Sequence, residues 1–329
     1  MFITRIPLRI SLFGGGSDLR EFLEHFPGAV FSFAINKYIH IVTNHQYRET
    51  FLLHYSDIEE TENVKNIKHP LFKEVFKKFN INAGIEVASF ADIPSNGSGL
   101  GSSSAFTSAL VKTVMFYKGE SVGQYESAFH AADIEINKVG SNIGMQDHFG
   151  CSIGGAKIIR FSLDQKPEVQ SFKIENLQQK MVEESFFLVD SGIRRSASDV
   201  LKKQHEKNNI DQYLDIQMKL VDLVLPGANA FMQGNLEVVS EILNESWRLK
   251  SKLTKKTTSA AILDICSEGL KQGALSCKLL GAGGGGFILF TSRKGDKENL
   301  KNFFNKKGLK TLDLKIDSEG LILLNNPFK

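Results

Sequence analysis

Three glycine-rich segments are the parts of this sequence best suited to chemistry. They read LFGGGSD over 12–18, PSNGSGLGSSSAF over 94–106 and GAGGGGF over 281–287. The second follows a predicted strand and opens a predicted helix, so its backbone N–H groups and the helix dipole can face a phosphate. Any one segment alone could be a tight turn or a flexible connection. Three in one chain favour a ligand with several anionic groups that backbone approaches from several sides.

The segment over 94–106 differs from the two common nucleotide-binding loops. A Walker A pattern is absent, and no Gly-Lys pair occurs in the chain. Gly97, Gly99 and Gly101 have GxGxG spacing, and the region that should supply the acidic residue of a dinucleotide site, 112–139, is predicted to be helical. Three hydroxyls, Ser102 to Ser104, fall in the first helical turn, where they can cap the helix or bind magnesium.

Glu135 is a carboxylate on the buried face of a predicted helix over 121–139. Ser121 and Gln124 have capping-box spacing at its start. The residues that share the face of Glu135 are small and apolar: Ala128, Ala131, Ala132 and Val139. A buried carboxylate needs a cation, and the pattern leaves an Arg or Lys partner and a metal equally open.

Two aspartates stand beside glycines. Asp147 is predicted to lie in a loop between Gly140 and Gly150, and Asp18 follows GGGS. Taken alone, each is most simply a turn residue. The histidines, including His148, show no metal-ligand spacing and are interpreted as ordinary core or surface residues.

The bulk composition is that of a globular protein with two domains and a cleft. The chain has 329 residues, 42% of them hydrophobic, and a formal net charge of +3. This near balance gives no reason to expect a nucleic acid or a membrane as a partner. Three cysteines without paired spacing form neither a disulfide framework nor a zinc signature. With no signal peptide and no apolar run of roughly 20 residues, we expect a cytoplasmic protein.

Hydrophobic periodicity predicts an α+β chain. The predicted strands cover 2–13, 30–34, 38–43, 51–55, 85–90, 156–161, 185–189, 277–280, 287–291, 311–316 and 320–324. The predicted helices cover 101–117, 121–139, 196–208, 212–232, 235–250, 258–272 and 296–306. The polar stretch over 163–173 is the most plausible boundary, which divides the chain into domains 1–170 and 171–329.

The three motifs RIPLRISLFGGGSDL, PSNGSGLGSSSAF and KLLGAGGGGF resemble those of the galactokinase, homoserine kinase, mevalonate kinase and phosphomevalonate kinase (GHMP) superfamily in order and approximate spacing. The resemblance spans residues 5–287. It implies an N-terminal domain like domain 2 of ribosomal protein S5, a ferredoxin-like C-terminal domain, and a site for ATP and Mg²⁺ between them. It is compatible with a monomer or a homodimer.

Within the superfamily, the chain most resembles the branch that acts on D-glycero-D-manno-heptose 7-phosphate. The evidence is LFGGGSDL without a GEH triplet, GMQDHFGCSIGG, VDSGIRRSASDVLKKQ, and Trp247 and Lys250 in ESWRLKSKL. Such an enzyme transfers the γ-phosphate of ATP to the anomeric C1 oxygen of this phosphorylated sugar, and the 1,7-bisphosphate is used to make nucleotide-activated heptose. The alternatives are a fucose or galactose 1-kinase, or an inactive ligand sensor. Ser103, Glu135 and Asp147 together argue against the sensor.

The resemblance also implies a role for individual residues. Asp147 is the expected catalytic base, Arg9 its neighbour at the transferring phosphoryl group, and Ser103 with Glu135 the magnesium ligands. The expected nucleotide-binding residues are Pro94, Asn96, Gly97, Ser98, Gly99, Leu100, Gly101, Ser102 and Ser103. The expected substrate-binding residues are Asp18, Gly15, Gly16, Gly283 and Gly284.

Arg194 and Arg195 are a further candidate for substrate binding. These adjacent arginines in SGIRRSAS follow a predicted strand and precede a predicted helix. A guanidinium fork suits phosphate, so they could clamp the phosphate of the sugar. The alternative is an ion pair at the surface.

Overall fold

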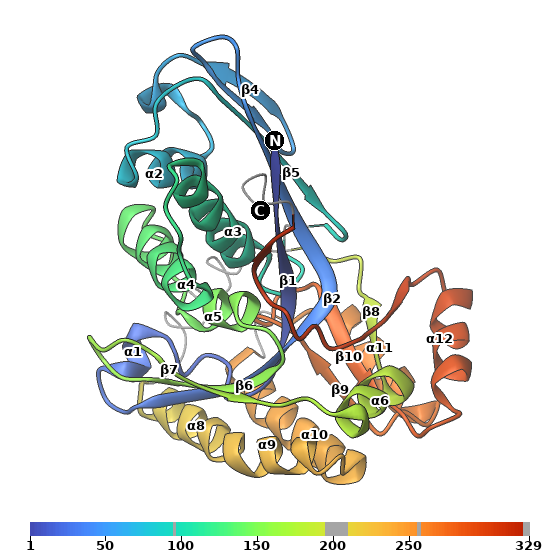
Figure 1. The fold of residues 1–329 in the computed structure, drawn as a ribbon. Coiled ribbons are helices and arrows are strands. Elements are labelled where there is room, and N and C mark those ends of the chain that lie inside the picture. The colour runs from blue at the N-terminus through green and yellow to red at the C-terminus, as the bar shows by residue number, and fades with distance from the viewer. Residues whose placement is uncertain (95–96, 195–209, 255–257, 325–329) are drawn as a thin grey trace.

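The structure, a computed structural model, describes residues 1–94, 97–194, 210–254 and 258–324. These residues form two β-sheets with helices packed around them (Figure 1). The strands are β1 Phe2–Phe13, β2 Gly28–His45, β3 Phe51–His54, β4 Ile58–Thr61, β5 Ile85–Ala91, β6 Ala156–Phe161, β7 Glu168–Phe172, β8 Phe186–Asp190, β9 Ser276–Leu279, β10 Phe287–Thr291, β11 Thr311–Asp313 and β12 Ile322–Leu323.

The helices include short turns as well as long packed elements. They are α1 Arg20–Leu23, α2 Pro70–Lys78, α3 Ser102–Tyr117, α4 Gln124–Asp133, α5 Gln146–Ser152, α6 Asn176–Ser185, α8 Ile210–Asp222, α9 Val224–Met232, α10 Leu236–Thr254, α11 Ala260–Lys271 and α12 Lys297–Lys306, with a 3₁₀ turn at Val64–Asn66 and a π-helical turn at Ile134–Lys138.

The first sheet is built around β1 and β2. Its strand order is β12-β1-β2-β5-β3-β4, and β6 and β7 continue from the other end of β2. Two predicted strands, over 30–34 and 38–43, are one strand in the structure, because the residues between them stay extended. The first part of β2 pairs with β6 and the last part with β5, so this one strand joins both wings of the sheet.

Helices cover both faces of this sheet. Helix α3 is buried along most of its length and packs with α2, α4 and α5 on one side (Figure 1). On the other side α9 from the second half of the chain packs against β2. Its Phe231 ring lies 5.3 Å from Phe31 and 5.4 Å from Phe33, centroid to centroid. This burial of aromatic surface holds the two halves together.

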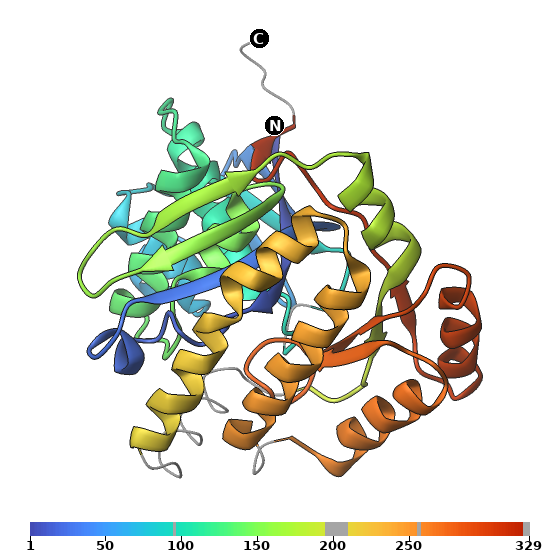
Figure 2. The ribbon, with the colours of Figure 1, turned by 90° about the horizontal axis from the view of Figure 1, so that it is seen from below.

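The second sheet is smaller and antiparallel throughout, with the order β11-β8-β10-β9. Phe187 and Phe290 stack on its inner face, and Phe304 of α12 packs against both. Helix α11 closes the same core, and α10 packs against β9. Figure 2 shows α10 beside this sheet, with α8 and α9 continuing toward β6 and β7.

Several predicted boundaries were wrong. The helix expected from residue 121 begins at Gln124 after Gly123, and no side-chain cap forms there. Helices α2 and α6 were not predicted, and α6 has the capping box, between Glu175 and Gln178. The single helix expected over 212–232 is two helices, α8 and α9. The helix expected over 196–208 lies outside the described residues.

The polar stretch over 163–173 contains a strand. Strand β7 pairs with β6 and belongs to the first sheet, so the chain leaves this sheet after Phe172. The chain later returns, because β12 pairs with β1 and Ile316 bridges to Ile35. The C-terminal segment thus contributes to the first sheet. The division into domains at residue 170 stays a prediction.

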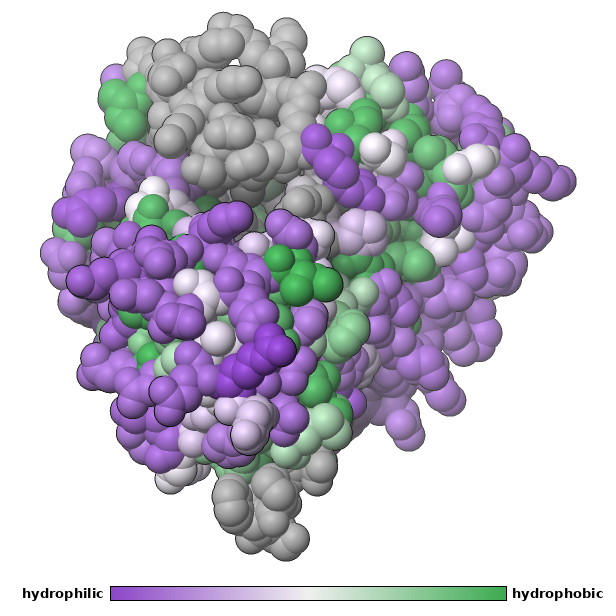
Figure 3. All heavy atoms as spheres, turned by 90° about the horizontal axis from the view of Figure 1, so that it is seen from above, coloured by the Kyte–Doolittle hydropathy of each residue, from purple (hydrophilic) through white to green (hydrophobic). Residues whose placement is uncertain are grey.

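One face of the molecule is mainly polar where its residues are described. In Figure 3 hydrophilic side chains dominate the visible described face, and hydrophobic ones occur in separate groups. No helix among the described residues is long and apolar enough to cross a membrane.

Candidate active site

The three glycine-rich segments meet at one cavity of about 560 Å³. Strand β1 and the loop after it line one side, the loop before α3 a second, and the loop between β9 and β10 a third. Six of the nine expected nucleotide-binding residues line the cavity: Gly97, Ser98, Gly99, Gly101, Ser102 and Ser103. Pro94 is exposed and, like Leu100, does not line it. Asn96 lies outside the described residues.

Leu100 faces away from the cavity for a clear reason. Its side chain is buried, its N–H donates to Ser98 Oγ at 3.2 Å, and its carbonyl accepts from the Arg9 backbone N–H at 3.1 Å. Both backbone groups are therefore occupied within the protein. The expectation that Leu100 offers its amide to a phosphate is not met in this geometry.

The glycines at the centre of the cavity allow two loops to touch backbone to backbone. A Cβ atom on Gly281 would lie 2.6 Å from the Gly99 Cα, and one on Gly286 would lie 2.4 Å from the Ser98 carbonyl oxygen. The Phe287 N–H donates to that same oxygen at 3.0 Å. These glycines thus serve first to bring the loop before α3 and the loop before β10 together, and the shared wall faces the cavity.

The start of α3 faces the cavity. Gly101 is the residue before its first turn, with φ +81°, and no side chain caps the helix there. Ser102, Ser103 and Ser104 all line the cavity. The N-terminus of a 16-residue helix with serines in its first turn is suited to binding an anion.

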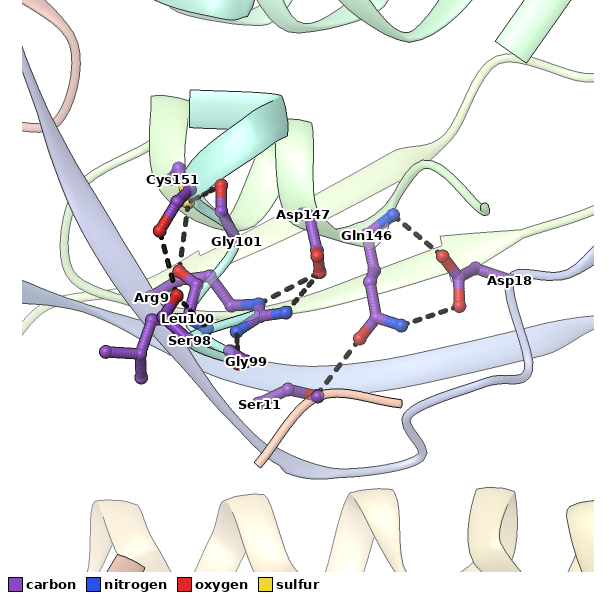
Figure 4. Close-up of polar contacts among 12 residues, drawn as sticks. Arg9, Ser11, Asp18, Ser98, Gly99, Leu100, Gly101, Gln146, Asp147 and Cys151 are labelled. Carbon is purple, nitrogen blue, oxygen red and sulfur yellow. Dashed lines mark hydrogen bonds and ion pairs between the residues drawn. The ribbon is translucent and has the colours of Figure 1, made fainter. Parts of the chain in front are cut away.

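Arg9 joins this loop to Asp147 (Figure 4). Its Nε and Nη2 donate to Asp147 Oδ1 at 3.0 and 2.5 Å, and its Nη1 donates to the Gly99 carbonyl at 2.8 Å. Burial alone would lower the pKa of Arg9, but the Asp147 carboxylate outweighs it and raises that pKa above its ordinary value. Arg9 therefore stays charged.

Asp147 lies in the first turn of α5, so its predicted place in a loop was wrong. The last five residues of this helix are buried, and Phe149 belongs to the cluster that holds α5 against the sheet. This packing, which a glycine-rich sequence does not reveal, fixes the direction of the Asp147 side chain.

Asp18 belongs to a second polar group beside that pair. Its carboxylate accepts from the Gln146 N–H at 3.0 Å and from Gln146 Nε2 at 2.8 Å, and Ser11 Oγ donates to Gln146 Oε1 at 3.1 Å (Figure 4). Burial raises the pKa of Asp18 to about 6. Gln146 and Ser11 were not predicted as site residues. Their only sequence signal is their position next to Asp147 and within the first motif.

Glu135 is buried, as predicted, and has its partners inside the protein. Ser103 Oγ donates to its Oε1, while His148 Nε2 lies 2.9 Å and Thr107 Oγ1 3.4 Å from its Oε2. Burial alone would raise the pKa of Glu135, but the bonds from His148 and Ser103 lower it. The partner is thus a histidine rather than Lys or Arg. His148 is therefore a buried core residue that also contacts a carboxylate of the candidate site.

Ser103 and Glu135 are suitable ligands for Mg²⁺. Both line the cavity and carry side-chain oxygen atoms, the ligands that Mg²⁺ prefers. Mg²⁺ commonly takes one or two protein ligands and completes its shell with phosphate oxygens and water. The described residues contain no group of three or more His, Cys, Asp or Glu that could hold a metal by itself. The donor set therefore fits a magnesium ion that arrives with a nucleotide.

Arg194 lines the cavity but is paired with Asp190. Its Nη1 and Nη2 donate to the two carboxylate oxygens at 2.7 and 2.6 Å, and its guanidinium lies over the Phe287 ring. The ion-pair alternative therefore describes Arg194 in this structure. Arg195 lies outside the described residues.

The other expected substrate-binding residues all line the cavity. These are Gly15, Gly16, Gly283 and Gly284. Residues that were not assigned to the site complete its wall from the second half of the chain. They are Tyr213, Gln217, Lys250, Leu253 and Lys278.

The fold and this cavity define a two-domain kinase, and comparison with known proteins identifies its family. The GHMP kinases N terminal domain matches residues 66–155, and the GHMP kinases C terminal domain matches residues 228–310, together just over half of the chain. This chain belongs to the GHMP kinases. It is a phosphotransferase that uses ATP and an alcohol acceptor, as its motifs predicted.

Similar proteins extend over nearly the whole chain. The D-glycero-alpha-D-manno-heptose 7-phosphate kinase of Campylobacter jejuni is 26% identical over 97% of both chains. A galactokinase of Thermotoga maritima is 24% identical, over 92% of this chain and 94% of that one.

Solved structures confirm the predicted fold class. A D-glycero-D-manno-heptose 1-phosphate kinase from Bacteroides thetaiotaomicron superposes with a TM-score of 0.81 at 18% identity, over 99% of both chains. A Lactococcus lactis galactokinase complexed with galactose gives 0.74 at 17% identity, over 98% of this chain and 94% of that one.

Proposed function

We propose that this protein transfers the γ-phosphoryl group of ATP to the anomeric C1 hydroxyl of D-glycero-D-manno-heptose 7-phosphate. The product is the 1,7-bisphosphate, a precursor of nucleotide-activated heptose. The observation that carries the proposal is that the Arg9–Asp147 pair and the Asp18–Gln146 pair lie side by side in one cavity with the start of α3. The similarity to the Campylobacter jejuni enzyme over the whole chain supports the choice of sugar.

Asp147 is the proposed base. Both bonds from Arg9 fall on Oδ1, and within the described part of the chain no hydrogen bond reaches Oδ2, so Oδ2 is placed to accept the proton of the acceptor hydroxyl. The acceptor oxygen then bonds to the γ-phosphorus, and the bond from that phosphorus to the β–γ bridging oxygen breaks. ADP leaves with the electron pair of that bond.

The loop before α3 and the first turn of α3 would hold the phosphates of ATP through backbone N–H groups. Ser103 and Glu135 would hold Mg²⁺, which neutralises phosphate charge when bound. His148 keeps the Glu135 carboxylate ionised and fixed in orientation, and Ser103 contacts its other oxygen.

Asp18 would accept hydrogen bonds from sugar hydroxyls, with Gln146 holding it in place and Gly15 and Gly16 leaving room beside it. For the phosphate of the sugar, the clamp by Arg194 and Arg195 stays a proposal. Arg194 would share its guanidinium between Asp190 and the phosphate, because its two terminal nitrogens already contact that carboxylate.

Measurement of ATP consumption over a panel of acceptors tests the function. The panel contains heptose 7-phosphate, mannose, fucose, galactose and their phosphates, with the phosphorylated carbon assigned by NMR. We expect turnover of heptose 7-phosphate at C1. Turnover of free fucose or galactose without turnover of heptose 7-phosphate would contradict the substrate and favour the second candidate, a fucose or galactose 1-kinase, which the similarity to galactokinases supports.

The clamp has its own test in the same assay. Arg194→Ala and Arg195→Ala are expected to raise the KM for the phosphorylated sugar while the KM for ATP changes little. An unchanged sugar KM in both variants would exclude the clamp.

A further inference from the structure

Lys250, near the C-terminal end of α10, reaches into the cavity from the second half of the chain. Its Nζ donates to the Gly281 carbonyl at 2.8 Å. That residue is the one whose backbone touches Gly99 in the loop before α3. Lys250 is therefore joined to the wall that would hold the phosphates of ATP.

The same amine also lies beside the acceptor side of the cavity. A Cβ atom on Gly15 would have three atoms close to it: Ser11 Oγ at 3.3 Å, Gln146 Oε1 at 3.7 Å and Lys250 Nζ at 3.8 Å. Ser11 and Gln146 are the residues that hold Asp18. Lys250 Nζ thus lies where the nucleotide side and the acceptor side of the cavity meet.

The charged groups around Lys250 come from several elements. Arg9 of β1 disfavours its charge, whereas Asp18 after β1 and Asp147 of α5 favour it. Burial is the largest influence, and together these lower the pKa of Lys250 to about 8. Lys278 of β9 is also close, and burial followed by the charge of Lys250 lowers the Lys278 pKa far below its usual value.

The buried surroundings of Lys250 favour the binding of an anion beside its ammonium group. Added negative charge stabilises a cation in a poorly hydrated cavity, and phosphoryl transfer brings that charge onto the equatorial oxygens of the γ-phosphoryl group. A lysine suits this position because its ammonium is a compact point charge with three donors.

We propose that the Lys250 ammonium group binds the γ-phosphoryl group during its transfer, together with the Arg9 guanidinium. Arg9 approaches from β1 and is fixed by Asp147 and Gly99, while Lys250 approaches from α10 and is fixed by Gly281. The transferring group would contact two cations, one from each half of the protein. The proposal rests on the cavity being the site of transfer.

Two variants of the full-length protein, Lys250→Ala and Lys250→Arg, test this role by comparison with the wild type. Lys252→Ala is the matched control, because Lys252 is two residues further along the same helix and is exposed. We expect Lys250→Ala to lower kcat by about 10²–10³-fold, as for removal of one group that stabilises developing charge. The binding of a fluorescent ATP analogue and the thermal midpoint should change little, and the control should keep wild-type kinetics.

The pH dependence separates a direct role from a structural one. The value of kcat/KM for ATP reports the enzyme before ATP binds, and we expect it to fall as the pH rises through about 8, where Lys250 loses its proton. In Lys250→Arg this alkaline fall should move above the measured pH range, because a guanidinium stays charged. The proposal is overturned if Lys250→Ala retains kcat within threefold, or if Lys250→Arg keeps the same alkaline fall.

The assay uses whichever sugar the wild-type enzyme phosphorylates. An error in the proposed sugar would change the acceptor for all variants alike. A failure of the Lys250 proposal would appear only in the Lys250 variants, either as a kcat within threefold of the wild type in Lys250→Ala or as an unchanged alkaline fall in Lys250→Arg.

Discussion

The Arg9 guanidinium binds Asp147 Oδ1 through two nitrogens and the Gly99 carbonyl through the third. One side chain from β1 thereby joins the candidate base on α5 to the loop before α3. In the proposed mechanism, this buried cation lies beside the phosphoryl group that is transferred.

The first prediction concerns Asp147. Asp147→Asn keeps the size of the side chain but removes its charge and its ability to take a proton. We expect kcat to fall by a factor on the order of 10²–10⁴, with little change in ATP binding measured by calorimetry. A loss below tenfold would mean that Asp147 only orients the acceptor, because the proposed acceptor group, an anomeric hydroxyl, is more acidic than an ordinary alcohol.

The second prediction concerns Glu135 as a metal ligand. Glu135→Gln should raise the magnesium concentration for half-maximal activity by about tenfold or more, because a neutral amide is a poorer ligand for Mg²⁺ than a carboxylate. Electron paramagnetic resonance of Mn²⁺ with a non-hydrolysable ATP analogue should show the same weakening. Glu126→Gln, an exposed change on neighbouring α4, is the control. Equal Mn²⁺ affinity in both variants would contradict the assignment.

The third prediction concerns Asp18, where function and stability oppose each other. In the folded protein the pKa of Asp18, about 6, is above its ordinary value of 3.8. The folded state therefore favours the protonated carboxyl, and the free energy of unfolding decreases as the pH rises from about 4 to 6, where Asp18 ionises. The pKa shift corresponds to about 3 kcal/mol of unfolding free energy. In the variant Asp18→Asn, the loss of one hydrogen-bond acceptor for Gln146 would offset part of the expected gain in stability.

Asp18→Asn should therefore be as stable as the wild type at pH 8, or about 1–2 kcal/mol more stable, with no such advantage at pH 4. Its KM for the sugar should rise tenfold or more. Urea unfolding at both pH values and steady-state kinetics measure the two effects. A variant that is clearly less stable at pH 8 would show that Asp18 serves the fold.

The fourth prediction concerns the contact between the glycine loops. Gly281 and Gly308 have similar φ values, +75° and +81°, but a Cβ on Gly281 would meet Gly99, whereas nothing lies within 4 Å of one on Gly308. Gly308→Ala should cost about 1 kcal/mol of unfolding free energy from backbone strain alone. Gly281→Ala should cost roughly 2–4 kcal/mol and weaken ATP binding. Equal costs would mean that the loops separate easily.

Strong local patterns predicted much of the fold. Strands β1, β6 and β10 have the predicted bounds, and α3 begins one residue later than expected. The burial of Glu135 also followed from its apolar neighbours, even though the helix widens to a π-helical turn there. Helices α2 and α6 escaped prediction, since their hydrophobic faces are short and α6 is mostly polar.

The sequence by itself determined the family, the three motifs and the candidate residues Arg9, Ser103, Glu135 and Asp147, because these depend on local residue types and order. The tertiary structure decided which groups meet. It paired Asp147 with Arg9 across 138 positions, gave Glu135 a histidine partner, and brought Lys250 of α10 to Gly281 in the wall of the same cavity. Such contacts depend on how β1, α5 and α10 pack around a shared core, and local periodicity carries no information about that arrangement.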